Sequence, residues 1–297
     1  MGTILAGTNF PTELVATMFN AVAGHSSLAK LCASTPIPFQ GQTVMVFTNA
    51  GEASLVAEGA AKPAGDADVS PVVIRPQKFV YQQRISDEFV KNSESRLNYL
   101  QAFAEGFGRV IARGLDIAAI HGIDPATKAD IAGLATNNFD DLLTGGAIIT
   151  YDSTNPDTNI QDAVNAIQGN DAQVTGIAMC PTFASDLGAL KVNGVPQFPE
   201  FRFGQNPAAF SGLASDVNST VDYTGAAVGA PTDYALVGDF ANAFKWGYAN
   251  NIPLEVIEYG DPDGAGHDLK QYNEVLLRAE AYIGWGILNP AAFAVVR

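Results

Sequence analysis

The sequence predicts an α+β fold, because two long strand patterns and one long helix pattern occur in the same chain. Side chains alternate over residues 71–85 and again over 274–287, as expected of β-strands. Apolar residues recur at three- and four-residue spacing over 94–121, as expected of a helix. Shorter helix and strand patterns alternate between 160 and 259. The chain has 297 residues, 47% of them hydrophobic, which allows one large domain or two modest ones.

The N-terminal residues are expected to form an arm, over residues 1–27. A short helix is predicted within it over 12–24, ending at Gly24. Residues 28–51 are then expected to form two short strands, one of them over 43–47.

The next segment, residues 52–85, carries two β-rich arms, 53–56 and 71–85, around a polar middle. About 15 alternating residues in the second arm would span roughly 50 Å as one strand. Pro71 and Pro76 lie within it, and proline is tolerated in strands only at edges or bulges. A two-stranded ribbon is marginal in water by itself. We therefore expect the ribbon to lie on a second copy of the chain.

The helix predicted over 94–121 carries a basic side, formed by Arg96, Arg109 and Arg113. Its three interior glycines would each weaken an isolated helix by about 1 kcal/mol relative to alanine. We expect them to mark a close crossing by another segment of backbone; they are Gly106, Gly108 and Gly114.

The later segments predict a mixed layer of helices and strands. Helices are expected over 160–168 and from Pro181 to about 193–194, and the segment 197–232 is rich in loops. In the closing strand, alternate residues should point to opposite sides, with Val275, Leu277, Ala279, Ala281 and Ile283 on one of them. The strands are expected at 174–180, 234–238, 254–259 and 274–287.

Charge is distributed unevenly along the chain, whose formal net charge is −15. Residues 129–264 hold 17 acidic and three basic residues, whereas the remainder holds 14 acidic and 13 basic residues. This step predicts domain boundaries near residues 128 and 264. It also argues against a specific nucleic-acid grip, which needs clustered basic residues.

No motif predicts catalytic, cofactor-binding or metal-ligating residues, so we expect no enzyme activity and no cofactor. The histidines, His25, His121 and His267, lack a second ligand at metal-binding spacing, and Cys32 and Cys180 are expected to be reduced and buried. No apolar stretch approaches the roughly 20 residues that cross a bilayer. A hydrolase that uses carboxylates of the acidic segment is kept as a remote alternative.

Five segments, in order, resemble the major capsid proteins of tailed bacteriophages, the family with the Hong Kong ninety-seven fold. The first is AEGAAKPAGDADVSPVVIRPQKFVYQQRISDEF at 57–89, followed by the predicted helix over 94–121. The others are AMCPTFASDLGALKVNGVPQF at 178–198, YALVGDFANAFK at 234–245 and VLLRAEAYIGWGILNPAAFAVVR at 275–297. The resemblance covers nearly the whole chain.

The resemblance implies an N-arm, an extended loop, a spine helix, a peripheral domain and an axial domain. The N-arm would be 1–27, the extended loop 52–88 and the spine helix 94–121. The peripheral domain would combine 28–51, 89–127 and 265–297, and the axial domain would be 128–264. The loop would touch an adjacent subunit through its charged residues, expected to be Glu58, Lys62, Asp66, Asp68, Arg75, Lys78 and Arg84.

The function implied is a shell protein of the virion, made in the cytoplasm of a bacterial host. Hexamers and pentamers would close an icosahedral shell around double-stranded DNA, without sequence-specific binding and without a membrane. A scaffolding protein, a portal and a decoration protein are implied partners. Some relatives link a lysine to an asparagine covalently; Lys62 and Asn289 are candidates by position, but we expect no such bond here. A nanocompartment shell of the same fold, the encapsulin type, is the alternative.

Overall fold

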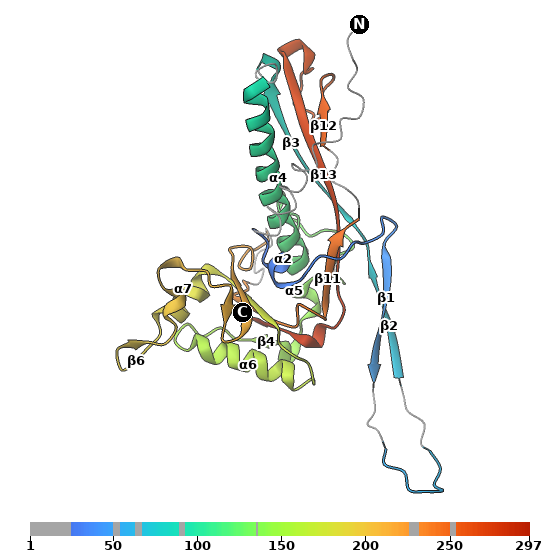
Figure 1. Cartoon of the computed structure of the whole chain (residues 1–297), viewed down its shortest axis with the longest axis vertical. Helices are drawn as coiled ribbons and strands as arrows, with labels where there is room; N and C mark the ends of the chain where they lie inside the picture. The colour runs from blue at the N-terminus through green and yellow to red at the C-terminus, as the bar shows by residue number, and fades with distance from the viewer. Residues whose placement is uncertain are drawn as a thin grey trace.

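The computed structural model describes residues 25–49, 54–62, 67–88, 93–134, 136–225, 232–249 and 254–297. The chain has three parts (Figure 1). A long helix lies along a sheet of long strands, a second sheet with shorter helices lies below it, and a two-stranded hairpin projects away from both. The predicted α+β class is confirmed. The helix expected at 12–24 falls outside the described residues.

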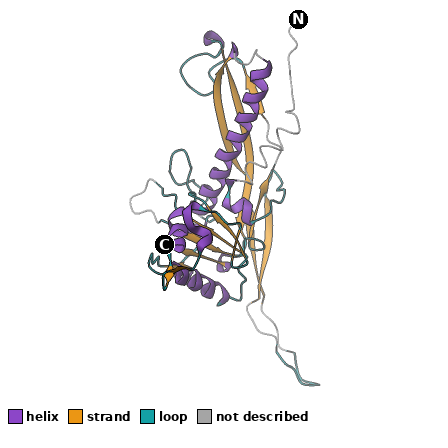
Figure 2. Ribbon diagram, turned by 60° about the vertical axis from the view of Figure 1, so that its left-hand side comes forward, coloured by secondary structure: helices purple, strands orange, loops and turns teal. Residues whose placement is uncertain are grey.

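The upper layer is built around the strand β13 (Glu274–Ile287). Strand β3 (Gln77–Ser86) pairs with one edge of β13, and β11 (Phe244–Tyr248) and β12 (Leu254–Ile257) pair with the other, all antiparallel. Helix α4 (Ser93–His121) runs along this sheet, as Figure 2 shows. Both long elements of this layer are therefore confirmed, with the start of the helix shifted by one residue. One of the two sides expected of β13 is buried: Val275, Leu277, Ala279, Ala281 and Ile283.

The long strand predicted over 71–85 is wrong in one respect, because it is two strands in two different sheets. Strand β2 (Ala67–Ile74) pairs with β1 (Gln42–Asn49), whereas β3 begins only at Gln77. Pro76 lies between them, and a proline has no N–H with which to continue a ladder. The strand predicted at 53–56 is not seen over 54–56. Two strands were expected over 28–51, and its described residues, 28–49, contain one, β1.

The lower layer is a six-stranded sheet with the order β4-β14-β10-β5-β9-β8. Helix α6 (Pro156–Gln168) packs against it near β10 and β14, and α7 (Pro181–Ala189) follows β5. The strands are β4 (Ile148–Ile149), β5 (Gly176–Met179), β8 (Ala209–Phe210), β9 (Leu213–Val217), β10 (Ala235–Gly238) and β14 (Phe293–Val296).

Helix α7 ends earlier than the sequence predicts. Asn193 and Gly194, expected at the end of the helix, instead form the turn of the hairpin β6 (Lys191–Val192) to β7 (Val195–Pro196). Both adopt positive φ, of 52° and 82°, and an Asn-Gly pair is the usual sequence for such a two-residue turn. The remaining short elements are α2 (Ser27–Leu31), α5 (Phe139–Leu142), η1 (Gly145–Ala147), η2 (Pro199–Gly204), η3 (Lys270–Tyr272) and η4 (Pro290–Ala292).

The sheets divide the chain differently from the charge step. Strands β11 and β12 lie within the acidic segment 128–264, yet they pair with β13 of the upper layer. Strand β14 lies within 265–297, yet it joins the lower sheet beside β10. Surface charge reports which segments are solvated, not which strands pair, so the predicted boundaries do not follow the sheets.

A continuous core joins the two layers. Phe139 packs edge-to-face on Phe293 of the lower sheet, with ring centroids 4.9 Å apart, and lies 5.7 Å from the ring of Phe244 of the upper sheet. Both cysteines are buried free thiols, as expected, and burial raises the pKa of Cys32 to about 11. None of the helices in the described residues is both long enough and apolar enough to cross a bilayer.

Candidate functional site

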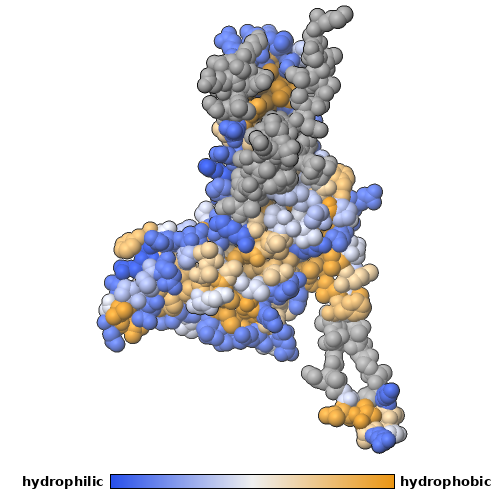
Figure 3. Space-filling model, in the orientation of Figure 1, coloured by the Kyte–Doolittle hydropathy of each residue, from blue (hydrophilic) through white to orange (hydrophobic). Residues whose placement is uncertain are grey.

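The hairpin of β1 and β2 exposes an apolar face to solvent. The register pairs Met45 with Pro71 and Phe47 with Val69, so these four side chains share one face with the pair Thr43 and Val73. All six are exposed, Phe47 by 71%. Figure 3 shows apolar atoms on the upper part of this hairpin and again at its tip. A bare two-stranded ribbon of this composition needs a partner surface to be stable.

The base of the hairpin is packed tightly against β13. Ile74, the last residue of β2, is fully buried. A Cβ added at Gly286 would lie 2.7 Å from Ile74 Cγ1, and one at Gly284 would lie 3.1 Å from Ile74 Cγ2. Gly41, with φ of +87°, lets the chain turn against the Ile74 carbonyl, which a Cβ there would meet at 2.8 Å. The glycines of β13 thus allow the hairpin to cross the sheet at close range.

The tip of the hairpin is described over residues 54–62. Leu55 is fully exposed, and Val56 is exposed beside it. A turn closes between Ala57 and Ala60, whose N–H donates to the Ala57 carbonyl at 3.1 Å. The tip therefore offers apolar side chains next to exposed charges.

The charged residues predicted to contact a neighbour fall into three groups. Glu58, Lys62 and Arg75 are exposed on the hairpin or at its base, as a contact requires. Asp66 falls outside the described residues, and the side chain of Asp68 does too. The exposed apolar residues of β1 and the tip were missed, because β1 was predicted as a short strand of 28–51, outside the ribbon 52–85. The unbroken apolar run at 44–47, next to that ribbon, is the signal that could have found them.

Lys78 and Arg84 do not lie on the hairpin, so their assignment to the extended loop 52–88 is corrected. Both are in β3, and both bind acidic groups of the same chain. The Lys78 ammonium is 2.7 Å from Glu280 Oε1 and lies over the Tyr282 ring, and the hydrogen bond to Glu280 raises the pKa of Lys78. The projecting hairpin therefore ends before Pro76, and Lys78 and Arg84 follow it in the sheet of the upper layer.

Arg84 is the centre of an ion-pair network at the far end of the upper layer. Its guanidinium donates to Asp261 Oδ1 at 2.6 Å, to Asp263 Oδ2 at 2.8 Å and to Glu274 Oε2 at 3.0 Å. The hydrogen bond from Arg84 holds the pKa of Asp263 well below its usual range, and it lowers that of Glu274. The network fixes the loop between β12 and β13 onto β3.

The predicted basic side of the spine helix is partly described. Arg109 and Arg113 are exposed on α4, whereas the side chain of Arg96 is not among those described. The Arg113 guanidinium lies 5.1 Å from the centre of the Tyr223 ring. Within the chain, Gly106 has open space around it, and Gly114 faces the ring of Phe79, so neither marks the backbone crossing that was expected.

A buried group of potential metal ligands lies where α4 ends: His121, Asp140 and Asp233. His121 Nδ1 is 2.9 Å from Asp140 Oδ2, and its Nε2 is 3.0 Å from the Thr220 carbonyl. Both ring nitrogens face acceptors, an arrangement that favours the doubly protonated imidazole. Burial opposes this charge, but the hydrogen bond and charge of Asp140 raise the pKa of His121.

Arg297 completes this group and makes it an ion-pair network. Its Nε donates to Asp233 Oδ1 at 2.6 Å, and its Nη2 donates to Asp140 Oδ1. Burial and the charge of Asp140 raise the pKa of Asp233 to about 7. Asp233 Oδ2 is buried without a hydrogen-bond partner, an environment that disfavours the ionised carboxylate. The Arg297 guanidinium thus pairs with both carboxylates of the group.

A second buried carboxylate, that of Asp116, binds the start of helix α2. Asp116 of α4 accepts hydrogen bonds from the N–H of Ser27 at 2.8 Å, from the N–H of Leu28 at 3.2 Å and from the hydroxyl of Thr220 at 2.9 Å. Burial raises its pKa to about 6. This carboxylate caps α2 and fixes it on the spine helix.

Comparisons with known proteins agree with this architecture. The sequence matches the phage capsid family over residues 6–297. A structure from Mycobacterium phage Ogopogo is 36% identical, covers 92% of each chain and superposes with a TM-score of 0.78. A structure from Gordonia phage Cozz is 25% identical, covers 92% of this chain and 86% of its own, and has a TM-score of 0.72.

A more distant structure, the capsid of an empty GTA particle computed with C5 symmetry, shares the fold. It is 15% identical, covers 100% of this chain and 93% of its own, and has a TM-score of 0.58. No curated protein gives a significant match to the chain.

Proposed function

The chain belongs to the phage capsid family and is a structural major capsid protein of a virion shell; we propose that its copies form the hexamers and pentamers of an icosahedral shell around phage double-stranded DNA. The net charge of −15 suits a container whose wall must not hold phosphates tightly.

The observation that carries this proposal is the bare apolar face of the β1–β2 hairpin. We propose that this face, led by Met45, Phe47 and Val69, lies across an adjacent subunit. A contact that buries about 600 Å² of apolar surface gives a gross gain on the order of 15 kcal/mol. Association entropy and the ordering of side chains remove much of this gain. The net free energy of each contact is then modest, but a closed shell contains many such contacts.

The other parts receive their roles from the family. Residues 1–27 would be an arm, the upper layer with α4 a peripheral domain, and the lower sheet an axial domain around the symmetry axes. Glu58, Lys62 and Arg75 would form polar contacts around the apolar face. A scaffolding protein, a portal and a decoration protein would be partners, synthesis would take place in the host cytoplasm, and the chain would have no enzyme activity.

The test replaces the two largest side chains of the exposed face. In the double variant Met45→Ser/Phe47→Ser, the subunit should fold with an unchanged melting temperature, because both side chains are solvated in the single chain. Its shells should fail to form, or form only at about tenfold higher concentration, as seen by negative-stain microscopy and light scattering.

The matched control is Met45→Leu/Phe47→Leu, which keeps both positions apolar and should assemble as the parent does. Normal shells from the serine variant would overturn the role of the hairpin. A parent chain that stays monomeric would overturn shell formation itself.

A further inference from the structure

The buried group at the end of α4 joins four segments of the chain. His121 is the last residue of α4, Asp140 lies in α5, Asp233 lies two residues before β10, and Arg297 directly follows β14. His121, Asp140 and Asp233 each place one potential ligand atom within 4.8 Å of the other two. A nitrogen and two carboxylate oxygens therefore meet where the spine helix joins the lower sheet.

Arg297 binds only one oxygen of each carboxylate. Its Nε donates to Asp233 Oδ1 at 2.6 Å, and its Nη2 donates to Asp140 Oδ1. Asp140 Oδ2 instead faces His121 Nδ1 at 2.9 Å, and Asp233 Oδ2 is buried without a partner. The side chain of Asp233 is only 1% exposed, so bulk water does not reach that oxygen. A buried acceptor left without a partner is uncommon, and a bound ion is one of its explanations.

Neighbouring groups orient these side chains as they do around a bound metal ion. His121 Nε2 lies 3.0 Å from the Thr220 carbonyl oxygen, so one ring nitrogen is held by the backbone while Nδ1 is turned towards the carboxylates. A metal-binding histidine usually donates its other N–H in this way, and metal-binding carboxylates are themselves hydrogen-bonded. Arg297 supplies those hydrogen bonds to both carboxylates.

Charge and spacing also favour a cation between the two Oδ2 atoms. Burial and the charge of Asp140 raise the pKa of Asp233 to about 7, which shows that two ionised carboxylates are unfavourable here even beside Arg297. A divalent ion would stabilise both of them. Two ligands of one zinc ion, each about 2.0–2.1 Å from it, lie roughly 3–3.5 Å apart. His121 Nδ1 and Asp140 Oδ2 are already at about this separation.

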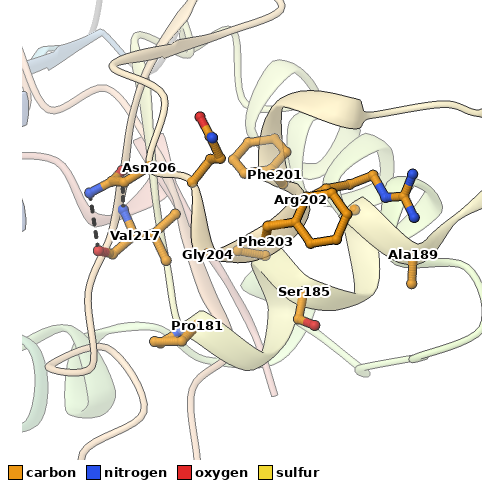
Figure 4. A pocket seen from close by; sticks show the side chains of 12 residues that line it. Pro181, Ser185, Ala189, Phe201, Arg202, Phe203, Gly204, Asn206 and Val217 are labelled. Atoms are coloured by element: carbon orange, nitrogen blue, oxygen red, sulfur yellow. Dashed lines mark hydrogen bonds between the residues drawn. The ribbon is translucent and has the colours of Figure 1, made fainter.

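Two other places in the described chain fit a cation less well. The hollow of about 460 Å³ between α7 and η2 has no His, Cys, Asp or Glu in its lining, and its one charged side chain, Arg202, extends alongside the Phe203 ring (Figure 4). Around Arg84, the guanidinium already contacts His267 and three carboxylates. The group at the end of α4 differs from both, because Asp233 Oδ2 has no partner.

We propose that His121 Nδ1 and the Oδ2 atoms of Asp140 and Asp233 bind one divalent transition-metal ion, with Zn²⁺ as the ion that best suits one imidazole and two carboxylates. Mg²⁺ and Ca²⁺ prefer ligand sets made of oxygen alone. The ion would enter beside Asp140, whose side chain is 14% exposed, and would brace α4 against the lower sheet. The inference does not depend on shell assembly, since all three ligands belong to one chain.

The test measures zinc binding by the purified full chain after EDTA has removed bound metal. We expect one Zn²⁺ per chain by isothermal titration calorimetry and by metal analysis. Zn²⁺ at 100 times its dissociation constant should raise the melting temperature by about 5 °C, and Mg²⁺ at the same concentration should raise it less. X-ray absorption at the zinc edge should show one imidazole among ligands at about 2.0–2.1 Å.

The decisive variant is Asp233→Asn, because the carboxamide keeps an oxygen for Arg297 but brings no charge to the metal. The affinity for zinc should fall by about 100-fold or more. Arg297→Lys keeps the positive charge but loses the planar fork that holds both carboxylates, so the affinity should fall by about 10–100-fold. The matched control is His267→Asn, which removes the histidine beside Glu274 and should bind zinc as the parent does.

A parent chain that binds no zinc would overturn the inference, and so would parental affinity in Asp233→Asn. Loss of zinc binding in His267→Asn would place the ion at the Arg84 network and overturn it as well. Each of these results would leave the proposed function intact, because shell formation is measured separately by microscopy of the same preparations.

Discussion

At the scale of single residues, the carboxyl of Asp233 couples the stability of the subunit to pH. Its pKa rises from an ordinary 3.8 to about 7 in the folded chain, because burial and the charge of Asp140 disfavour ionisation. A raised pKa favours folding while the group is protonated. The stabilisation is complete below about pH 4 and is lost as the pH rises towards 7. Asp116, raised to about 6, acts in the same direction.

The first prediction is that Asp233→Asn flattens this dependence. The carboxamide keeps an oxygen for Arg297 and an N–H for Asp140, but it cannot ionise. The parent subunit should lose on the order of 2–4 kcal/mol of unfolding free energy between pH 5 and 8, and the variant should lose less. Melting temperatures over this range measure the effect. Asp162→Asn, an exposed site on α6, is the control, and equal slopes for parent and Asp233→Asn would contradict the account.

A second prediction compares two glycines of the same helix. Gly106 has open space where a Cβ would be, so Gly106→Ala should stabilise the unassembled subunit by about 0.5–1 kcal/mol. At Gly114 the new Cβ would lie 3.0 Å from the Phe79 ring, so Gly114→Ala should gain less or destabilise. Chemical denaturation gives the unfolding free energies of the two variants and so tests this prediction. A larger gain at Gly114 than at Gly106 would be inconsistent with the packing of β3 on α4.

At the scale of elements, the junction between hairpin and sheet sets where the ribbon points. Ile74 of β2 fits against Gly284 and Gly286 of β13 with no room for a side chain at either glycine. The hairpin direction is therefore fixed by contacts of β13, which lies about 200 residues later in the chain. Long-range packing of this kind explains why a short ribbon can project from the body in one orientation.

The third prediction follows from this contact. Gly286→Ala should cost about 1–3 kcal/mol, because the new Cβ would lie 2.7 Å from Ile74 Cγ1 and the base of the hairpin must shift. The shifted hairpin should also lower the yield of shells. Adding Ile74→Ala should recover part of that yield, because it removes the clash, even though it loses apolar burial. Unfolding free energies and shell yields together test this. Independent, additive effects of the two changes would argue against contact between these residues.

Local periodicity was enough to predict the elements whose pattern is long. Helix α4 and strand β13 were found nearly to the residue, because many alternating or helically spaced residues agree in each. The division of 71–85 into β2 and β3 was not predictable from alternation, since both halves keep the same period and only their partners differ. The pairing of β11 and β12 with β13 likewise depends on contacts between segments distant in sequence.

The sequence predicted that a ribbon contacts another copy, but it did not predict which side chains form the exposed face. The ribbon was expected to lie on another copy, but the residues chosen were its charges. Arg84 turned out to bind Asp261, Asp263 and Glu274 of its own chain. The apolar face with Met45 and Phe47 was missed because an unbroken apolar run is usually buried within its own fold.

At the scale of the whole molecule, the chain is a body with two surfaces that it cannot cover by itself. One is the apolar face of the hairpin, and the other is the exposed ring of Phe203 in η2. The hairpin projects away from both sheets, as Figure 1 shows, whereas Phe203 lies in η2 of the lower layer.

Electron cryomicroscopy of particles assembled from the chain tests the central claim most directly. We expect density for the β1–β2 hairpin across an adjacent subunit, with Met45, Phe47 and Val69 covered by that neighbour. Closed shells in which this face remains in solvent, or packs back on its own subunit, would contradict the account.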